Sequence, residues 1–261
     1  MNTGLAILSH ALRMLIFDTA TTLRVLMPAL LIVLGATVAI AFFAPEMLDL
    51  MGGPAEDMAP PAPATAVLFI VFALVAIAGY TLMAILWHRH VLLDGAKGLD
   101  GVQPDAGIFF GYLWRAILVA CVQILAAIPV TLAMGLLATL LVAGLPLGLA
   151  GLLVGIGGGI VFVWIALRVS VVLPAAALAR PMTIRESWAT TAPLSGPLWG
   201  LALLLTGLNA LVGLLLPFVI PPLPVFAAAI HTVVFVAEGL IFISVLTTLY
   251  GHLVEGRSLG Q

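Results

Sequence analysis

Long apolar runs alternate with short polar segments along the whole chain. Six runs reach the length of about 20 residues that a helix needs to cross a bilayer core about 30 Å thick. They are Val25–Ala44, Ala66–Trp87, Ala116–Ala143, Leu145–Leu167, Pro197–Ile220 and Val225–Tyr250. None of them shows the apolar/polar alternation of a β-barrel strand, and backbone at membrane depth must satisfy its own hydrogen bonds. We therefore predict an all-α, polytopic membrane protein in which residues 1–261 form a single transmembrane domain of six transmembrane helices.

Two shorter segments have the pattern of helices that lie on a membrane surface. In residues 1–22, leucine and isoleucine recur at steps of three and four, with His10 and Arg13 elsewhere around the helix. This spacing predicts an N-terminal amphipathic interfacial helix. Near residues 183–191, Thr183 and Glu186 have the spacing of a capping box, and Trp188 suits an interfacial anchor. We predict a short cytoplasmic interfacial helix there.

The positive charges predict the orientation of the chain. In a six-span topology all nine lysines and arginines fall on one side of the membrane, at Arg13, Arg24, Arg89, Lys97, Arg115, Arg168, Arg180, Arg185 and Arg257. Because cytoplasmic segments carry the excess of lysine and arginine, both termini are predicted to be cytoplasmic. The expected location is the inner (cytoplasmic) membrane of a bacterial cell.

Composition narrows the function classes. Hydrophobic residues make up 64% of the chain and charged residues 8%, which is too little charge for a water-facing surface. A net charge of −2 gives no attraction to nucleic acid. The single cysteine, Cys121, excludes a multi-cysteine metal site, and we expect no metal and no cofactor.

One ionisable residue lies deep inside a span. Glu238 is near the middle of the sixth run, where an ionised carboxylate is costly unless it is hydrogen-bonded or faces a wet cavity. Asn209 and Gln123 lie at a similar depth in their spans, and His231 lies two turns away on the same helix face. These four residues form a candidate midplane polar site. The alternative is a neutral glutamate that bonds Asn209 only to fix helix packing.

The fourth run contains small residues at helical spacing. Gly151, Gly155 and Gly159 form two overlapping GxxxG steps, which let another helix approach closely. The Lys-Ser/Thr pair of a phosphate-binding loop is missing. We predict a helix-packing role for the three glycines and leave open whether the partner helix belongs to the same chain.

Basic and aromatic residues near the predicted cytoplasmic ends suit anionic lipid headgroups. The candidate headgroup contacts are Arg89, Arg168, Arg180, Arg185 and Trp188. His88 and His90 flank Arg89, but a His-x-His pair on a helix points its rings about 200° apart and does not converge on a metal. We interpret them as part of a solvated interfacial loop. No catalytic motif is found, so we expect no enzyme activity.

Short motifs carry a family resemblance. Trp87-His-Arg-His-Val-Leu-Leu and the stretch from Trp164 through Arg168 and Pro174 to Trp188 and Thr191 resemble two related groups of bacterial six-helix proteins. These are the YciC-like integral membrane proteins and the membrane domain of glycerophosphoryl diester phosphodiesterases. The resemblance implies a six-helix topology and a lipid-associated setting. It transfers no catalytic residue, because the catalytic part of the phosphodiesterases is a separate soluble domain.

Two functional hypotheses remain from the sequence. The first is a non-enzymatic, multi-pass inner-membrane protein with a lipid-associated, scaffolding or accessory role, whose partners are membrane lipids and other membrane proteins. The second is a small transporter or proton-coupled permease that uses the polar track around Glu238. A wet cavity at Glu238 would favour transport, and a dry interior with a lateral groove beside Arg168 and Arg180 would favour lipid contact. The substrate and the oligomeric state are not readable from the sequence.

Overall fold

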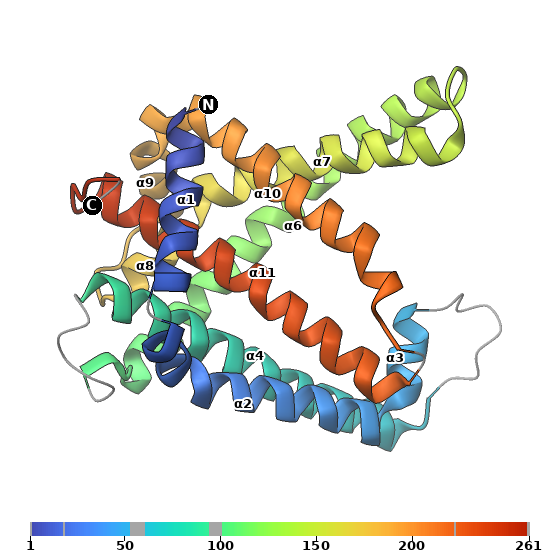
Figure 1. The fold of residues 1–261 in the computed structure, drawn as a ribbon, viewed down its shortest axis with the longest axis horizontal. Helices are drawn as coiled ribbons and strands as arrows, with labels where there is room; N and C mark the ends of the chain where they lie inside the picture. The colour runs from blue at the N-terminus through green and yellow to red at the C-terminus, as the bar shows by residue number, and fades with distance from the viewer. Residues whose placement is uncertain (1, 18, 53–60, 94–100, 222, 260–261) are drawn as a thin grey trace.

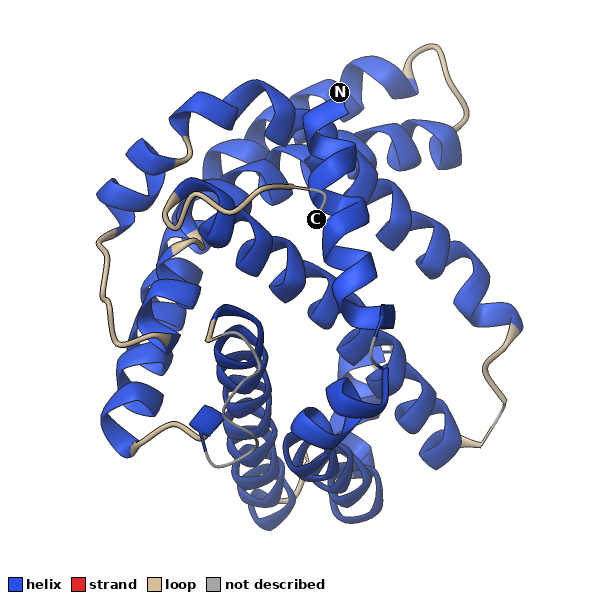
Figure 2. Ribbon diagram, turned by 60° about the vertical axis from the view of Figure 1, so that its left-hand side comes forward, coloured by secondary structure: helices blue, strands red, loops and turns tan. Residues whose placement is uncertain are grey.

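The computed structural model describes residues 2–17, 19–52, 61–93, 101–221 and 223–259, and these residues form helices and connecting loops without strands (Figures 1 and 2). Six helical segments in this part of the chain are long and apolar enough to cross a membrane. They contain the helices α2 (Thr19–Phe43), α4 (Pro63–Leu92), α6 (Ala106–Val142), α7 (Leu147–Val169), α10 (Ser195–Leu215) and α11 (Pro224–Leu253). The prediction of an all-α, six-span protein is confirmed.

Shorter helices connect and flank the spans. They are α1 (Asn2–Phe17), α3 (Pro45–Gly52), α8 (Val172–Ala177), α9 (Ile184–Thr190) and the 3₁₀ turns η2 (Ala192–Leu194) and η3 (Leu216–Phe218). The capping box expected at α9 is present, because Thr183 Oγ1 accepts from the Glu186 backbone N–H while the Glu186 carboxylate accepts from the Thr183 N–H at 2.6 Å. These bonds, together with the bond from the Thr183 hydroxyl, hold the pKa of the Glu186 carboxyl below its usual value.

Two helix boundaries differ from the sequence prediction. Helix α6 begins at Ala106 rather than near residue 116, because the Asp105 side chain accepts a hydrogen bond from the Ile108 N–H at 2.8 Å and caps the helix there. Helix α2 begins at Thr19, so the amphipathic helix ends at Phe17 and not at residue 22. Both differences lengthen a span beyond its purely apolar run.

Helix α11 lies at the centre of the molecule and joins two hydrophobic clusters. One face of α11, with Leu246 and Leu249, packs with α1, α7, α8 and α10. Its neighbouring face, with Val236, packs with α2 and α4. Helices α2 and α4 approach closely where Gly79 faces α2, since a Cβ at this position would lie 2.9 Å from Val33 Cγ2. These two clusters therefore meet at α11, whereas α6 packs through two smaller clusters against α4, α7 and α8.

Helix α1 crosses the ends of α10 and α11 rather than running parallel to them (Figure 1). Its face with Ile7 and Ala11 is fully buried, and Gly4 lies so close to α10 that a Cβ there would be 2.7 Å from the Pro197 carbonyl oxygen. Phe17, at the other end of α1, is 94% exposed. The predicted amphipathic helix thus has one face docked on the protein and large apolar side chains that remain uncovered.

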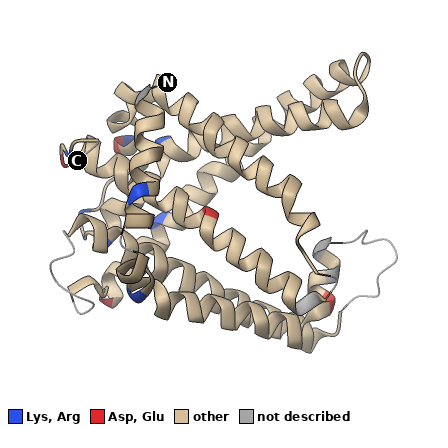
Figure 3. Ribbon diagram, viewed as in Figure 1, with Lys and Arg blue, Asp and Glu red and all other residues tan. Residues whose placement is uncertain are grey.

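The outer parts of α6 and α7 form an arm that projects from the bundle (Figure 1). The most apolar stretch of the α6 span buries none of its residues inside the protein, whereas the corresponding stretch of the α2 span buries 39%. At the opposite end of the molecule lie both chain ends and the described arginine residues (Figure 3). The molecule thus has one basic end and, at the other end, an arm that is unpacked against the rest of the protein.

Candidate functional site

A groove of about 440 Å³ opens between α7, α10 and α11, within the membrane-spanning segments. Helices α10 and α11 both extend from the basic end across the molecule (Figure 1). The groove between them and α7 has mostly apolar walls, with Val163, Leu205, Phe235 and Phe242 among them. Glu238 and Asn209 bring polar atoms to this surface. We refer to it as the Glu238 groove.

Glu238 and Asn209 form a hydrogen-bonded pair across the groove. The Asn209 Nδ2 group donates to both carboxylate oxygens of Glu238, each at 3.3 Å. Glu238 is half-buried and Asn209 is exposed. Among the described residues, no lysine, arginine or histidine lies within ion-pair distance of the Glu238 carboxylate. Because a carboxylate can accept about four hydrogen bonds, it retains acceptor capacity toward a molecule in the groove.

Gln123 and His231 do not join this pair. The Gln123 Nε2 group donates to the Phe162 carbonyl at 3.3 Å, so it links α6 to α7. The exposed His231 donates from Nδ1 to the Ala227 carbonyl at 2.9 Å, one turn back along its own helix. Equal depth in neighbouring spans does not bring side chains together when the helices face different neighbours. The four-residue polar track expected from the sequence is therefore reduced to Glu238 and Asn209.

Thr206 is a third polar residue at the groove, and the sequence analysis did not select it. It lies one turn before Asn209 on α10 and is 8% exposed, and its hydroxyl oxygen is buried without a hydrogen-bond partner in the described structure. Its methyl group packs on Gly159 of α7, where a Cβ would lie 2.8 Å away. The sequence did contain a signal for Thr206: it lies three residues before Asn209, and this spacing places both side chains on one helix face.

Of the three predicted packing glycines, only Gly159 lies at a close helix contact. A Cβ on Gly151 or Gly155 would meet no atom within 4 Å. Within this chain Gly151 and Gly155 make no close helix contact, because α7 and α10 are in contact around Gly159 and separate toward the arm. That these two glycines pack against a helix of another chain stays a prediction.

Arg168 is buried in the protein rather than turned toward a headgroup. It is 4% exposed, and its Nε, Nη1 and Nη2 donate to Thr191 Oγ1 at 2.7 Å, Ser195 Oγ at 3.0 Å and the Trp188 carbonyl at 2.7 Å. Its guanidinium carbon also lies 4.2 Å from the centre of the Trp188 ring. The expectation of a headgroup contact is therefore wrong for Arg168, which joins α7 to α9 and α10 instead.

The other candidate headgroup contacts differ in how much of each side chain is free. The half-buried Arg89 donates to the carbonyls of Val102 at 2.9 Å and Ala177 at 3.0 Å, so it serves mainly as a tie between segments. Trp188 is 40% exposed beside Arg168. Arg185 is exposed on α9. Only the outward-facing groups of this set, Arg185 above all, have the access that a headgroup contact requires.

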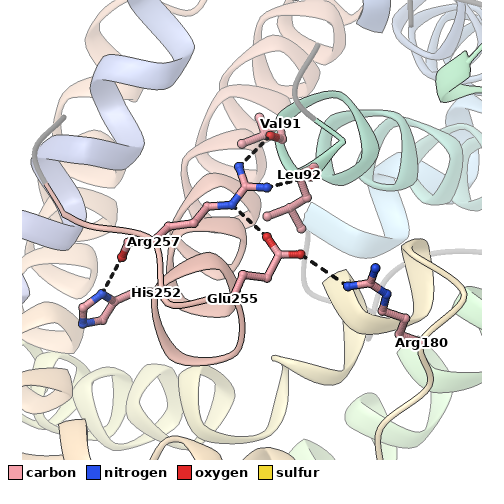
Figure 4. A network of polar contacts seen from close by, with 6 residues as sticks. All are labelled: Val91, Leu92, Arg180, His252, Glu255 and Arg257. Atoms are coloured by element: carbon pink, nitrogen blue, oxygen red, sulfur yellow. Dashed lines mark hydrogen bonds and ion pairs between the residues drawn. The ribbon is translucent and has the colours of Figure 1, made fainter. Parts of the chain in front are cut away.

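Arg180 belongs to a network at the C-terminal end of α11 (Figure 4). Its Nη1 lies 3.7 Å from Glu255 Oε1, although 70% of the Arg180 side chain is exposed. Glu255 also accepts from Arg257 Nε at 2.8 Å, and Arg257 Nη2 donates to the Leu92 carbonyl at 2.7 Å. A guanidinium at the last carbonyls of a helix is favourable because those carbonyls have no partner within the helix. The network therefore caps α4 with the segment that follows α11.

His88 is also buried, in contrast to the solvated loop expected for it. It is 0% exposed, and its Nδ1 lies 2.8 Å from Thr247 Oγ1. The Thr247 hydroxyl donates to the Ile243 carbonyl at 2.8 Å, so it accepts from His88, and Nδ1 carries the ring proton. The bare Nε2 then accepts from the Tyr112 hydroxyl at 3.4 Å. This neutral chain of hydrogen bonds links α4, α6 and α11.

Among the described residues, no group of three or more histidine, cysteine, aspartate or glutamate side chains is placed to hold a metal ion. Asp94 and Asp100, which follow the two histidines, lie outside the described residues. The Glu238 groove is therefore the candidate site, because the Glu238 carboxylate, the Asn209 amide and the Thr206 hydroxyl all lie at its surface. Comparisons with protein-family models, with curated proteins and with solved structures found no match to this chain.

Proposed function

We propose that this multi-pass membrane protein is a non-enzymatic, lipid-associated protein that takes an amphiphilic molecule from the bilayer into the Glu238 groove. The observation that carries the proposal is the composition of the groove: apolar walls within the spans and one carboxylate–amide pair on its surface. An apolar chain fits such walls, and a hydrogen-bond donor on the same molecule would satisfy the free acceptor capacity of Glu238.

Lipid association is favoured over transport by what surrounds the polar pair. A proton or solute pathway needs polar groups in sequence across the membrane. Gln123 and His231 make their hydrogen bonds elsewhere, so the polar side chains that line the groove are Glu238, Asn209 and Thr206, in walls that are otherwise apolar. The groove does not lie beside Arg168 and Arg180, where the sequence analysis expected lipid contact, because Arg168 is buried and neither arginine lines it. Its apolar walls nevertheless support the lipid-associated hypothesis, with the lipid bound at Glu238.

The proposed setting is the inner membrane of a bacterial cell with both termini in the cytoplasm. The one-sided distribution of lysine and arginine supports this orientation. The resemblance to YciC-like proteins and to the phosphodiesterase membrane domain supports a lipid-associated role without catalysis.

The test is to fill the groove and measure what remains bound. A Cβ on Gly239 meets no atom within 4 Å and this residue lines the groove, so Gly239→Trp adds an indole at the open space. Gly207→Trp is the matched control, because Gly207 is an exposed glycine in α10 with equally open surroundings that does not line the groove. Each variant is extracted in native-lipid particles, and the bound lipid is identified by native mass spectrometry.

We expect one class of amphiphile to be retained by the wild type and by Gly207→Trp and to be lost from Gly239→Trp. Glu238→Leu should lose the same species, since the apolar walls alone do not hold its polar end. Equal lipid profiles for all four proteins would overturn the proposal. Solute uptake into vesicles that depends on Glu238 would replace it with the transport hypothesis.

A further inference from the structure

A second groove, of about 660 Å³, lies between α2, α4 and the start of α6. Its walls within the spans are apolar and come from all three helices, with Ile32 and Val75 farthest from the basic end and Leu86 and Phe109 nearer to it. Gln103 and Asp105 line the end of the groove that lies just before α6 begins. The groove therefore changes from apolar to polar along its length, in the direction that leads from membrane depth to the basic end.

Arg24 carries a positive charge near the polar end, or mouth, of this groove. Arg24 is exposed and lies one turn before Pro28 on α2, and Pro28 lines the groove. Residues four apart share a helix face, so Arg24 shares the face of α2 that carries Pro28 and lies one turn nearer the basic end, next to the lining residue Val25. Among the described residues, neither Arg24 nor Asp105 has an ion-pair partner within 4.0 Å.

Asp105 can bind a cation while it keeps its structural role. One of its oxygens, Oδ1, accepts from the Ile108 N–H and caps α6. A carboxylate accepts about four hydrogen bonds in total, so the exposed side chain has capacity for an ammonium group. The mouth thus offers a guanidinium to an anion and a carboxylate to a cation, next to an apolar channel for a hydrocarbon chain.

We propose that this groove is a binding site for a phospholipid with a primary-amine headgroup. One acyl chain lies along the apolar walls between α2 and α4, the phosphate is bound by Arg24, and the ammonium group donates to Asp105. Charge complementarity selects the headgroup: a glycerol headgroup supplies no ammonium, and a choline headgroup has no N–H to donate. The site is separate from the Glu238 groove, because the two share no lining residue.

The experiment titrates delipidated protein in detergent with dioleoyl phosphatidylethanolamine, phosphatidylcholine or phosphatidylglycerol and follows thermal stabilisation and bound lipid by native mass spectrometry. Wild-type protein should bind the ethanolamine lipid most tightly. Arg24→Gln should weaken that binding about fivefold, the effect of one basic side chain near a lipid phosphate. Asp105→Asn keeps the cap, since asparagine is an equally good N-cap residue, and should remove the preference for ethanolamine over choline.

Matched variants separate the site from general surface charge. Arg13→Gln removes an exposed arginine of α1, whose residues do not line the groove, and should leave binding unchanged. Ala78→Trp fills the groove and should abolish binding, whereas Ile77→Trp, on the neighbouring exposed position, should not. Val75→Trp serves as a second groove-filling variant if Ala78→Trp unfolds in the absence of lipid.

Three results would overturn the proposed site. The first is an equal loss of affinity for the ethanolamine lipid in Arg13→Gln and Arg24→Gln, and the second is an equal affinity of the wild-type protein for the three lipids. The third is unchanged binding of the ethanolamine lipid to both Ala78→Trp and Val75→Trp. The Gly239→Trp variant distinguishes this inference from the proposed function, because it should empty the Glu238 groove and leave ethanolamine-lipid binding intact.

Discussion

Arg168 and His88, near the basic end, differ from the polar residues of the Glu238 groove in how completely their polar atoms are hydrogen-bonded. At the basic end, Arg168 and His88 are almost completely buried, and the nitrogen atoms of each have protein partners. In the groove, Glu238 and Asn209 have each other and an open space, and the Thr206 hydroxyl has no partner in the described structure. Polar residues that look equally functional in the sequence thus fall into two kinds. In one kind the polar atoms already have hydrogen-bond partners in the protein and stabilise the fold. In the other kind they retain capacity to bind another molecule.

The difference has a physical origin in the backbone. Where helices end, carbonyls lack intrahelical partners and arginine side chains can satisfy them. Arg89 and Arg257 do so at the ends of α8 and α4. In the middle of a span the carbonyls are already bonded within the helix, so a carboxylate there depends on a side chain from another helix. Asn209 supplies that side chain and leaves the remaining capacity of Glu238 open.

The largest effect should come from removing Arg168. Arg168→Gln leaves the Trp188 carbonyl and the Ser195 hydroxyl without their charged donor, and we expect a loss of about 3 kcal/mol in the free energy of unfolding. Arg168→Lys should also destabilise, because an ammonium group cannot reproduce the fork of three donors. Chemical unfolding in mixed micelles measures both. The control is Arg185→Gln, at an exposed arginine, and it should change the free energy of unfolding by less than about 0.5 kcal/mol. Similar losses for Arg168→Gln and Arg185→Gln would show that the buried hydrogen bonds of Arg168 do not stabilise the fold.

The next effect concerns the glycines of α7. Gly159→Ala forces a methyl group into Thr206 and should cost about 1–3 kcal/mol, the usual price of overpacking. The matched control is Gly155→Ala, at a glycine one turn earlier on the same helix where a Cβ would meet no atom within 4 Å; it should stay within about 0.5 kcal/mol of the wild type. Chemical unfolding in mixed micelles measures both variants. A large loss of unfolding free energy in Gly155→Ala would mean that a further helix packs at Gly155.

A smaller effect is expected at His88. Thr247→Val leaves the buried His88 Nδ1–H without an acceptor and should cost about 1–2 kcal/mol of unfolding free energy. His88→Phe removes both hydrogen bonds of the ring. Since the two residues share one bond, the double variant should lose less than the sum of the single losses. Additive losses would show that the contact between Nδ1 and Oγ1 contributes nothing to stability.

The smallest effect depends on pH and concerns the cap of α9. The Thr183 hydrogen bonds lower the pKa of the Glu186 carboxyl, so the folded state favours the ionised form. Its contribution to stability is therefore present above the ordinary pKa of 4.5 and is lost as the pH falls through the lower, folded-state value. The difference in Tm between wild type and Glu186→Gln should shrink below pH 4.5. A difference that is constant over this range would contradict the role of the charge.

The spans could be predicted because their signal is local. A run of about 20 apolar residues is a property of consecutive positions, and it does not depend on which helices meet. The start of α6 was missed because Arg115 interrupts the apolar sequence near the start of the helix, and the prediction counted only the run that follows it. A helix cap that lies ahead of such a run is a sequence signal that could have moved the boundary.

The partners of polar side chains could be predicted only in part. Counting depth along the spans correctly paired Asn209 with Glu238, since α10 and α11 do face each other at that level. The same count failed for Gln123, whose helix faces α7 instead. Arg168 resembled a headgroup contact because it ends an apolar run, and its partners Thr191 and Ser195 become visible only when α9 folds back over it.

The docking of α1 sets an order of assembly. Ile7 and Ala11 are buried against α10 and α11, which begin only at Ser195 and Pro224. Until those helices have been synthesised and have entered the bilayer, the apolar side of α1 lacks this protein surface, and the lipid interface can cover it instead. Docking of α1 therefore has to follow the insertion of α10 and α11, and it joins two parts of the chain that are far apart in the sequence.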